Sequence, residues 1–352
     1  MSEKIQIAGL SLSELTERIK AEGLPGFRAK QIYSNLLKQK EFSEMTDLPK
    51  ALRDTLSERC EVRSAEIYRK FLSRDGTAKY LLRMGDGELV ECVRMKQDYG
   101  DTLCVSCQSG CRMGCKFCAS GLSGLKRNLT AGEILSEVLA VNAEGVQPGE
   151  SGRNITNIVM MGCGEPFDNY DNTLKFLRLV TSPEGLNVSP RNISVSTCGL
   201  ADRVREFAGE GISVTLCFSM HSPFDERRAE IMPVEKKFKI AEVLSAFGEY
   251  FERTGRRFII EYTVIPGFND REEDADELKR LLAGKVCHVN LIPLNRVEES
   301  GLPGGAGRAD AEAFLKKLLA RRLSATVRRS AGSDIEGACG QLRRKYSAEE
   351  ER

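Results

Sequence analysis

Three cysteines within eight residues are the feature of this sequence that most clearly indicates chemistry. Cys111, Cys115 and Cys118 form a C-x3-C-x2-C pattern in the stretch CQSGCRMGCKFC. The chain has 12 cysteines in 352 residues, and at that frequency chance would produce only about 0.01 such patterns. The N-terminus lacks the uninterrupted hydrophobic stretch of a signal peptide, so we expect a cytoplasmic protein with reduced thiols. The pattern therefore predicts metal ligands or reactive thiols.

Two kinds of metal centre could use these thiols. A zinc site of four thiolates would combine the pair Cys104 and Cys107 with the last two cysteines of the pattern. Only seven residues separate those pairs, whereas zinc sites of this kind usually allow roughly 12–20. An iron–sulfur cluster fits better, because three cysteines fill three corners of a four-iron cube and leave one iron open to a substrate.

A carboxylate in an apolar strand is a second candidate for chemistry. The stretch ELVECVRM alternates in polarity, and Leu89, Glu91, Val93 and Met95 share one face of the expected strand. A carboxylate among apolar side chains is either paired with a basic group or at a sheet edge, or it is an acid/base group in a pocket that excludes water.

The elements that must position these residues alternate between strands and helices from residue 102 onward. Six β/α units of this kind predict an α/β fold with parallel strands, a partial (β/α)6 TIM-like barrel, in which chemistry lies at the carboxyl ends of the strands. We expect strands at 102–107, 157–162, 193–197, 213–221, 258–265, 288–295 and 325–330, and helices at 130–145, 172–181, 201–210, 240–255, 274–284 and 309–322.

Three regions are expected along the chain. Residues 1–62 read as a small helical domain with helices at 11–23, 28–40 and 49–60. Residues 63–100 read as a β-hairpin extension around the turn GDGE. The barrel core would occupy residues 101–345 and include a C-terminal segment that carries Cys339.

The charge distribution leaves one question open. The net charge is +1, which does not identify a partner, and no apolar run approaches the ~20 residues of a membrane span. From Lys316 to Lys345, however, the sequence contains nine basic residues and only two acids, Asp334 and Glu336. This segment is either a solvated helix face and tail or a surface that contacts phosphates.

Beyond these patterns, the cysteine loop resembles that of a known superfamily. C-x3-C-x2-C with Phe117 before the last cysteine, after the first strand of a partial barrel, looks like the radical S-adenosylmethionine (SAM) superfamily. There a [4Fe–4S] cluster binds SAM through its open iron and cleaves it to a 5′-deoxyadenosyl radical. The ordered motifs TLCVSCQSGCRMGCKFC, MMGCGEP, FSMHSP, HVNLIPLN and DIEGACGQL resemble, more narrowly, the RlmN/Cfr family of RNA adenine methyltransferases over nearly the whole chain.

This resemblance implies a mechanism and roles for particular residues. Cys111, Cys115 and Cys118 would hold the cluster. Cys339 would take a methyl group from one SAM, and a second SAM would supply the radical that activates that methyl group for addition to the ring. Glu91 would remove the ring proton, and Cys104 would release the product by forming a transient disulfide.

The resemblance also implies SAM contacts at strand ends. They are Gly164, Glu165, Ser196, Ser219, Met220, His221 and Asn295. This chain departs from the family pattern at a few positions. Cys107 stands where the family usually has Ser, beside the proposed resolving thiol, where an off-pathway disulfide could form. Arg296 replaces the usual Pro after Asn295.

The implied substrates are RNA. The family resemblance points to an adenosine of 23S rRNA at the peptidyl transferase centre and to the adenosine 3′ of the anticodon in tRNA. Methylation at C2 is favoured because MGCGEPFDNYDN and NLIPLN look more similar to RlmN-type sequences, and Cfr-type C8 methylation is the alternative. A flavodoxin or ferredoxin reductant and a monomeric state are expected. A non-catalytic RNA-binding protein with a structural metal is the alternative of a different class.

Overall fold

The computed structural model describes residues 4–62, 64–98, 100–122, 124–144, 155–294, 307–329 and 331–335. Asn295 and Cys339, two of the expected site residues, lie outside the described residues. Among the described residues, no helix is long and apolar enough to span a membrane.

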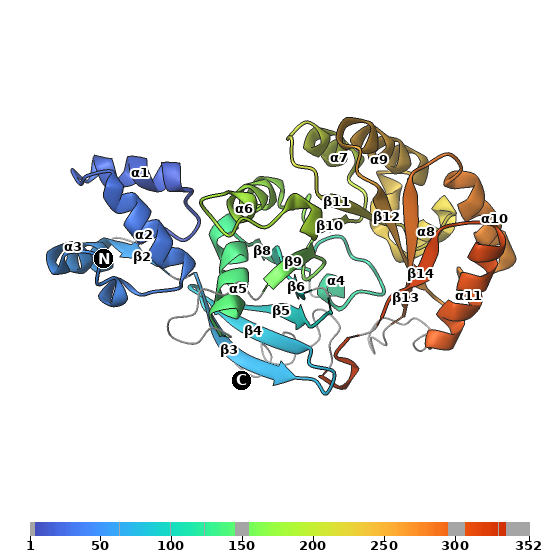
Figure 1. The fold of residues 1–352 in the computed structure, drawn as a ribbon. Helices are drawn as coiled ribbons and strands as arrows, with labels where there is room; N and C mark the ends of the chain where they lie inside the picture. Colours follow the sequence, from blue (N-terminus) through green and yellow to red (C-terminus); the bar gives the residue numbers. More distant parts are fainter. Residues whose placement is uncertain are drawn as a thin grey trace.

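A ten-stranded sheet in the order β14-β13-β12-β11-β10-β9-β6-β5-β4-β3 forms the body of the molecule (Figure 1). From β14 to β6 every neighbouring pair is parallel. The parallel strands are β6 (Asp101–Cys104), β9 (Ile155–Met160), β10 (Ile193–Thr197), β11 (Thr215–Ser219), β12 (Phe258–Val264), β13 (Cys287–Pro293) and β14 (Ala325–Val327). Each was expected from the sequence, and the expected alternation of parallel strands with helices is confirmed.

Helices connect the parallel strands and cover one face of the sheet. They are α5 (Ala131–Glu144), α6 (Tyr170–Thr181), α7 (Ala201–Ala208), α8 (Asp225–Ile231), α9 (Ile240–Thr254), α10 (Glu272–Leu281) and α11 (Arg308–Ala320). The short helix α8 was not expected, because DERRAEI is almost entirely polar and has no apolar period.

Alternate residues of each strand face opposite sides of the sheet, and the two sides differ in polarity. Residues such as Phe218, Ile260 and Val289 pack in the main core beneath the helices. Their strand neighbours Ser219 and Glu261 point to the other side, which we call the inner face. Polar side chains on the inner face of a barrel-like sheet need a partner, so this face is where a ligand is expected.

The extension completes the sheet on its other side. The expected hairpin is confirmed as β4 (Ala78–Met84) and β5 (Leu89–Met95), and β5 pairs with β6 in antiparallel fashion. A further strand, β3 (Ala65–Leu72), pairs with β4 and forms the edge of the sheet opposite to β14.

The N-terminal residues form three helices with a core of their own, as the sequence predicted. These are α1 (Leu12–Ala21), α2 (Phe27–Leu37) and α3 (Lys50–Arg59), and two short strands, β1 (Ile5–Gln6) and β2 (Cys60–Glu61), pair in parallel beside them. Residues including Leu15, Ile32 and Met45 are buried among these elements. A Cβ built on Gly9 would lie 2.9 Å from Cα of Gly132 in α5. Glycine is therefore required where this region touches the rest of the chain.

Candidate functional site

A cavity of about 270 Å³ opens where the parallel strands end. Its lining includes the three cysteines of the loop and five of the expected SAM contacts: Cys111, Cys115, Cys118, Gly164, Glu165, Ser196, Ser219 and His221. The carboxyl ends of parallel strands converge in a barrel, so residues distant in sequence meet there.

The cysteine loop is held in place by main-chain hydrogen bonds. Cys111 donates from its N–H to the carbonyl of Gly124 (2.9 Å), and Lys116 donates to the carbonyl of Ile231 (3.0 Å). Gly110 begins the loop with φ +80°, and a Cβ there would lie 1.9 Å from the oxygen of Gly124. Only glycine allows this close approach, which brings the strand before the loop against the strand after it.

The three thiols suit an iron–sulfur cluster. Burial raises the pKa of Cys111 to about 12 and raises the pKa of Cys115 well above its usual value. Metal binding would displace these protons and remove the cost of burying a thiolate. Across the part of the chain that the structure describes, no three Cys, His, Asp or Glu side chains converge so as to hold a single metal ion. Three thiols that line one cavity can serve as ligands of an iron–sulfur cluster.

His221 forms one wall of the cavity and has a fixed tautomer. The imidazole Nδ1 accepts a hydrogen bond from the N–H of Thr263 (2.9 Å), so the proton of the neutral ring is on Nε2. Burial lowers the pKa of His221 to about 3, which keeps the ring neutral. The ring packs edge-on against Phe117 of the cysteine loop, with 4.6 Å between ring centres.

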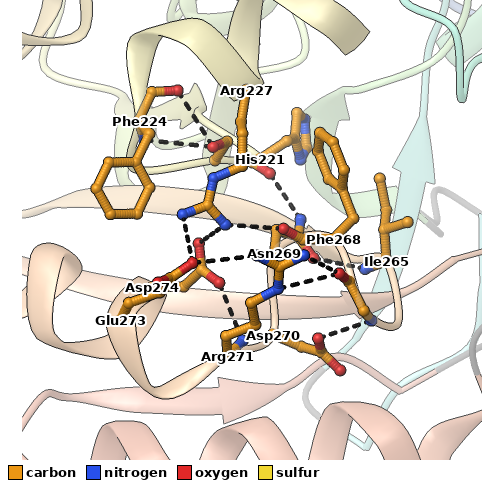
Figure 2. Close-up of polar contacts among 12 residues, drawn as sticks. His221, Phe224, Arg227, Ile265, Phe268, Asn269, Asp270, Arg271, Glu273 and Asp274 are labelled. Atoms are coloured by element: carbon orange, nitrogen blue, oxygen red, sulfur yellow. Dashed lines mark hydrogen bonds and ion pairs between the residues drawn. The ribbon is translucent and has the colours of Figure 1, made fainter.

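Asn269 holds the backbone around His221 (Figure 2). Its Nδ2 donates to the carbonyls of His221 and Thr263 (both 2.7 Å), and its Oδ1 accepts from the N–H of Ile265 (2.7 Å). His221 has φ +57°, a left-handed conformation that is strained for most residues. Three hydrogen bonds from one fully buried amide therefore stabilise a strained residue at the cavity.

Arg228 holds the ends of two strands from the other side. Its guanidinium donates to the carbonyls of Met220 (3.0 Å), Cys198 (2.6 Å) and Ser219 (3.0 Å). The fully buried charge is paired with the carboxylate of Glu235, which is also fully buried. Met220 itself is buried and does not line the cavity. It lies at the end of β11, where Arg228 binds its carbonyl.

The GEP segment lies against the cysteine loop. Gly164 has φ +109°, and a Cβ there would lie 2.8 Å from Sγ of Cys107. Both carboxylate oxygens of Glu165 accept main-chain N–H groups, one from Cys198 (2.7 Å) and one from Phe167 (3.1 Å). Burial raises the pKa of Glu165. This carboxylate therefore fixes the shape of the cavity edge by tying β9 to β10.

A row of polar side chains crosses the inner face below the cavity opening. The hydroxyls of Ser196 and Ser219 lie 3.1 Å apart. Ser219 is in register with Glu261, which is in register with Asn290, and Asn290 Nδ2 donates to both carboxylate oxygens of Glu261 (3.2 and 3.0 Å). Arg328 completes the row and also lines the cavity.

The residues missed from the sequence include Arg228, Asn269, Glu261, Asn290 and Arg328. Glu261 had a readable signal, because it is an acid in the middle of the apolar strand FIIEYTV, just as Glu91 is in ELVECV. Arg228 and Asn269 act on main-chain atoms, and nothing in their neighbouring residues indicates this.

Glu91 and Cys104 are brought together, but outside the cavity. Val93 is in register with Cys104 on the adjacent strand, and Glu91 is two residues before Val93, so both site residues are on the inner face. Glu91 is 4% exposed and forms an ion pair with Lys79 Nζ (3.1 Å), whose side chain is fully buried. Of the alternatives that the sequence left open, the paired acid is the one observed, and an acid/base role is compatible with it.

The departure from the family pattern at Cys107 has a structural explanation. Cys107 belongs to the main core, on the face opposite to Cys104.

The structure also bears on the basic segment from Lys316 to Lys345. Within it, Arg321 pairs with Asp276 (2.6 Å) and Glu272 (2.8 Å) of α10. Arg321 therefore ties two helices together, and this residue favours the solvated-face interpretation over phosphate contact.

Comparison with known proteins gives consistent matches. Residues 105–278 match the radical SAM superfamily, and residues 5–62 match the ribosomal RNA large subunit methyltransferase N-terminal domain. Two similar proteins bear the name probable dual-specificity RNA methyltransferase RlmN. The one from Lachnoclostridium phytofermentans is 47% identical over 99% of this chain and 96% of its own. The one from Clostridium perfringens is 49% identical over 97% of each chain.

A solved structure is also similar over nearly the full length. It is a radical SAM methyltransferase from Sphaerobacter thermophilus, with a TM-score of 0.90 and 43% sequence identity. The match covers 96% of this chain and 98% of that one. The helical N-terminal region and the barrel-like sheet therefore occur together in a related enzyme.

Proposed function

The chain belongs to the RlmN family of radical SAM RNA methyltransferases, and from this premise we propose that it methylates C2 of adenosine in RNA. The proposed substrates are one adenosine of 23S rRNA at the peptidyl transferase centre and the adenosine 3′ of the anticodon in tRNA. The family implies a [4Fe–4S] cluster and SAM as cofactors.

The observation that supports the proposal most strongly is that the three cysteines and five of the expected SAM contacts line one cavity. Cys111, Cys115 and Cys118 would bind three irons of the cluster, and the residues at the ends of β9, β10 and β11 would surround SAM at the fourth. When bound, the cluster and SAM supply the methyl group and the radical chemistry. The protein's own residues bind, orient and exclude water.

Side chains next to the cavity would carry out the remaining steps. Cys339 would accept the methyl group on its sulfur. Cys104, on the inner face beside the cavity, would attack the sulfur of Cys339 once the transferred carbon joins that sulfur to the adenine ring. The sulfur–carbon bond would break as the disulfide forms, and the carbon would leave with the RNA and take up a proton to become the new methyl group. Glu91 would take the proton from the adenine ring. Its ion pair with Lys79 gives the buried carboxylate a partner before that transfer.

The arrangement around Glu91 supports a fixed position for this base. The hydroxyl of Ser106, two residues after Cys104, donates to the carbonyl of Glu91 (2.7 Å) and accepts from the N–H of Cys163 (2.9 Å). One side chain therefore links the strand of the base, the strand of the resolving cysteine and the edge of the cavity. We propose that this linkage sets the separation between the base and SAM.

The cellular setting follows from the proposed substrates. An enzyme that modifies rRNA and tRNA is expected in the cytoplasm, with a flavodoxin or ferredoxin as electron donor and with a monomer as the working form. An adenosine within folded RNA must be unstacked to enter a cavity of this kind.

Mass spectrometry of rRNA and tRNA from cells with and without the gene tests the proposal. Loss of 2-methyladenosine from both RNAs is expected. Loss of 8-methyladenosine alone would instead assign the Cfr-type reaction. No change in either nucleoside, or a purified protein that holds zinc and no iron, would favour the non-catalytic RNA-binding alternative.

A single variant tests the residue roles. Cys104→Ala should leave the protein covalently joined to RNA through Cys339, because no thiol remains to release the product. Gel electrophoresis with mass spectrometry of the adduct detects this link. Free turnover by the variant would contradict the resolving role.

A further inference from the structure

The chain after β14 returns to the far edge of the sheet and binds there. In Figure 1 this dark-red segment lies beside the turn that joins β3 to β4. The N–H of Gly332 donates to one carboxylate oxygen of Asp75 (3.0 Å). In return, Asp334 accepts from the N–H of Arg74 (3.1 Å) and from the hydroxyl of Ser73. We call residues 73–77 and 331–335 together the latch.

The turn that receives the segment has a fixed shape of its own. Ser73 donates from its N–H to the carbonyl of Thr77 (2.8 Å), and the second carboxylate oxygen of Asp75 accepts from the N–H of Thr77 (2.9 Å). Asp75 thus closes the turn with one oxygen and binds the C-terminal segment with the other. These hydrogen bonds to N–H groups hold the pKa of Asp75 well below its usual value.

The C-terminal side of the latch also has little freedom. Gly332 has φ +64°, and a Cβ there would lie 3.1 Å from Cγ2 of Thr77 and 3.2 Å from Cγ1 of Ile335. The N–H of Ile335 donates to the carbonyl of Gly332 (3.2 Å). A glycine that fits closely against the turn, followed by a hydrogen-bonded turn of its own, fixes the position of Ile335.

The distances along the chain connect the latch to Glu91. Ile335 precedes Cys339 by four residues, which span at most about 14 Å. On the strand that follows the turn, Leu81 is four residues beyond Thr77, so these two residues lie about 14 Å apart along the strand. Leu81 is in register with Glu91 on the adjacent strand. Lys79, the partner of Glu91, lies between them on the inner face. A segment anchored at the turn can therefore just reach the strands that carry Glu91 and Cys104.

We propose that the latch positions Cys339 for its reaction with Cys104, with Asp334 and Asp75 as positioning residues. This inference rests on the proposed roles of those two cysteines. It adds that the C-terminal segment is anchored at the β3–β4 turn, about 260 residues earlier in the chain, and that this anchor limits how far Cys339 can extend.

Disulfide trapping tests this proposal without turnover. The full-length protein is produced without iron so that Cys339 stays unmethylated, reconstituted with its cluster, and oxidised with diamide in the absence of SAM. Peptide masses first verify the free thiol and then give the rate at which the Cys104–Cys339 disulfide forms. Asp334→Ala should slow this rate at least fivefold.

Two further variants separate positioning from general stability. Asp310→Ala is the matched control, because Asp310 also accepts a main-chain N–H, that of Gly307 (2.8 Å), but at the start of α11. Its trapping rate should equal that of the unaltered protein. Insertion of two glycines after Ile335 leaves the latch residues in place but alters the reach, so it should also slow trapping, while hydrogen exchange at Arg74 and Gly332 stays slow.

The outcomes distinguish this proposal from the function on which it rests. Unaltered protein that forms no Cys104–Cys339 disulfide would contradict the proposed pairing of the two cysteines. Unaltered protein that forms it, together with Asp334→Ala and insertion variants that form it equally fast, would overturn the latch as a positioning device.

Discussion

Two polar clusters share the inner face of the sheet, and they are built differently. Around the cavity, Arg228 and Asn269 bind mainly main-chain atoms: Arg228 binds three carbonyls in addition to the carboxylate of Glu235, and Asn269 binds two carbonyls and one N–H. On the extension, Lys79 and Glu91 bind each other as two buried charges.

The two clusters therefore suit different tasks: one fixes the shape of the cavity, and the other contains the proposed base for proton transfer. Side chains that bind the backbone fix the walls of a cavity and stay in one protonation state, which suits the binding of a cluster and SAM. The proposed base belongs instead to a separate ion pair with Lys79, so a proton that it accepts does not pass through those walls. The molecule therefore keeps its proposed base apart from the cavity that would hold its cofactors, while Ser106 links the two.

The largest effect is expected from the cavity cysteines. Cys115→Ala should abolish the cluster, because three thiolates are the least that hold a cube with one open iron. Iron and sulfide assays and the visible absorption of the reconstituted protein measure this. Cys217→Ala, at a buried cysteine of β11 that does not line the cavity, should retain full iron content. Equal iron content in both variants would contradict the role of Cys115 as a ligand of the cluster.

A smaller but substantial effect is expected at the buried ion pair. Lys79→Met should lower the free energy of unfolding by about 3–5 kcal/mol, because the buried carboxylate of Glu91 would lose the lysine that balances its charge. Replacing both residues, as in Lys79→Met with Glu91→Leu, should restore most of that stability but not methylation. Urea unfolding and RNA methylation assays check the two results.

An exposed pair serves as the control for this experiment. Lys126 pairs with Glu88 (3.2 Å) and is 51% exposed, so Lys126→Met should cost less than about 1 kcal/mol. A double variant that regains methylation along with stability would show that Glu91 is only structural.

The next effect is a pH dependence from His221. The unfolded imidazole takes up a proton below pH 6.5, whereas the native ring stays neutral down to about pH 3. Stability from this group is therefore present above pH 6.5 and is lost as the pH falls. Between pH 6.5 and 5.0 the loss is about 1.5 kcal/mol. Urea unfolding at the two pH values should show this extra loss in the unaltered protein and not in His221→Asn, since asparagine tolerates a positive φ.

The smallest effect is expected at the serine pair. Ser219→Ala removes one hydroxyl from the cavity wall, which should weaken SAM binding about fivefold, or about 1 kcal/mol. Equilibrium dialysis with labelled SAM measures the affinity. Ser245→Ala, at an exposed serine of α9, should bind SAM as tightly as the unaltered protein. An equal SAM affinity for Ser219→Ala would show that the Ser219 hydroxyl does not contribute to SAM binding.

Local patterns predicted the positions of the strands, whereas the family resemblance implied the cavity residues. Alternation identified the strand of Glu91, and Ser196 and Ser219, which the resemblance implied, fall at strand ends as the barrel rule requires. The same alternation rule, applied to Glu261, would have found a further cavity residue.

Other features depend on partners that no local pattern reveals. Lys79 reads as a surface residue in KYLLRM, yet it is fully buried because the register of β4 and β5 places it near Glu91. Arg228 and Asn269 bind carbonyls that only the folded chain brings to them. The latch joins residues about 260 positions apart, so its two halves could not be paired before the fold was known.

The central claim is that Cys111, Cys115 and Cys118 hold a cluster whose open iron meets SAM in the cavity at the strand ends. Electron–nuclear double resonance of the reduced, reconstituted protein tests it directly, with SAM labelled by ¹⁵N at its amino group and ¹⁷O at its carboxylate. We predict a coupling from each label to the cluster spin, and its loss in Cys115→Ala. A reduced cluster whose spectrum shows no coupling to either label would contradict the claim.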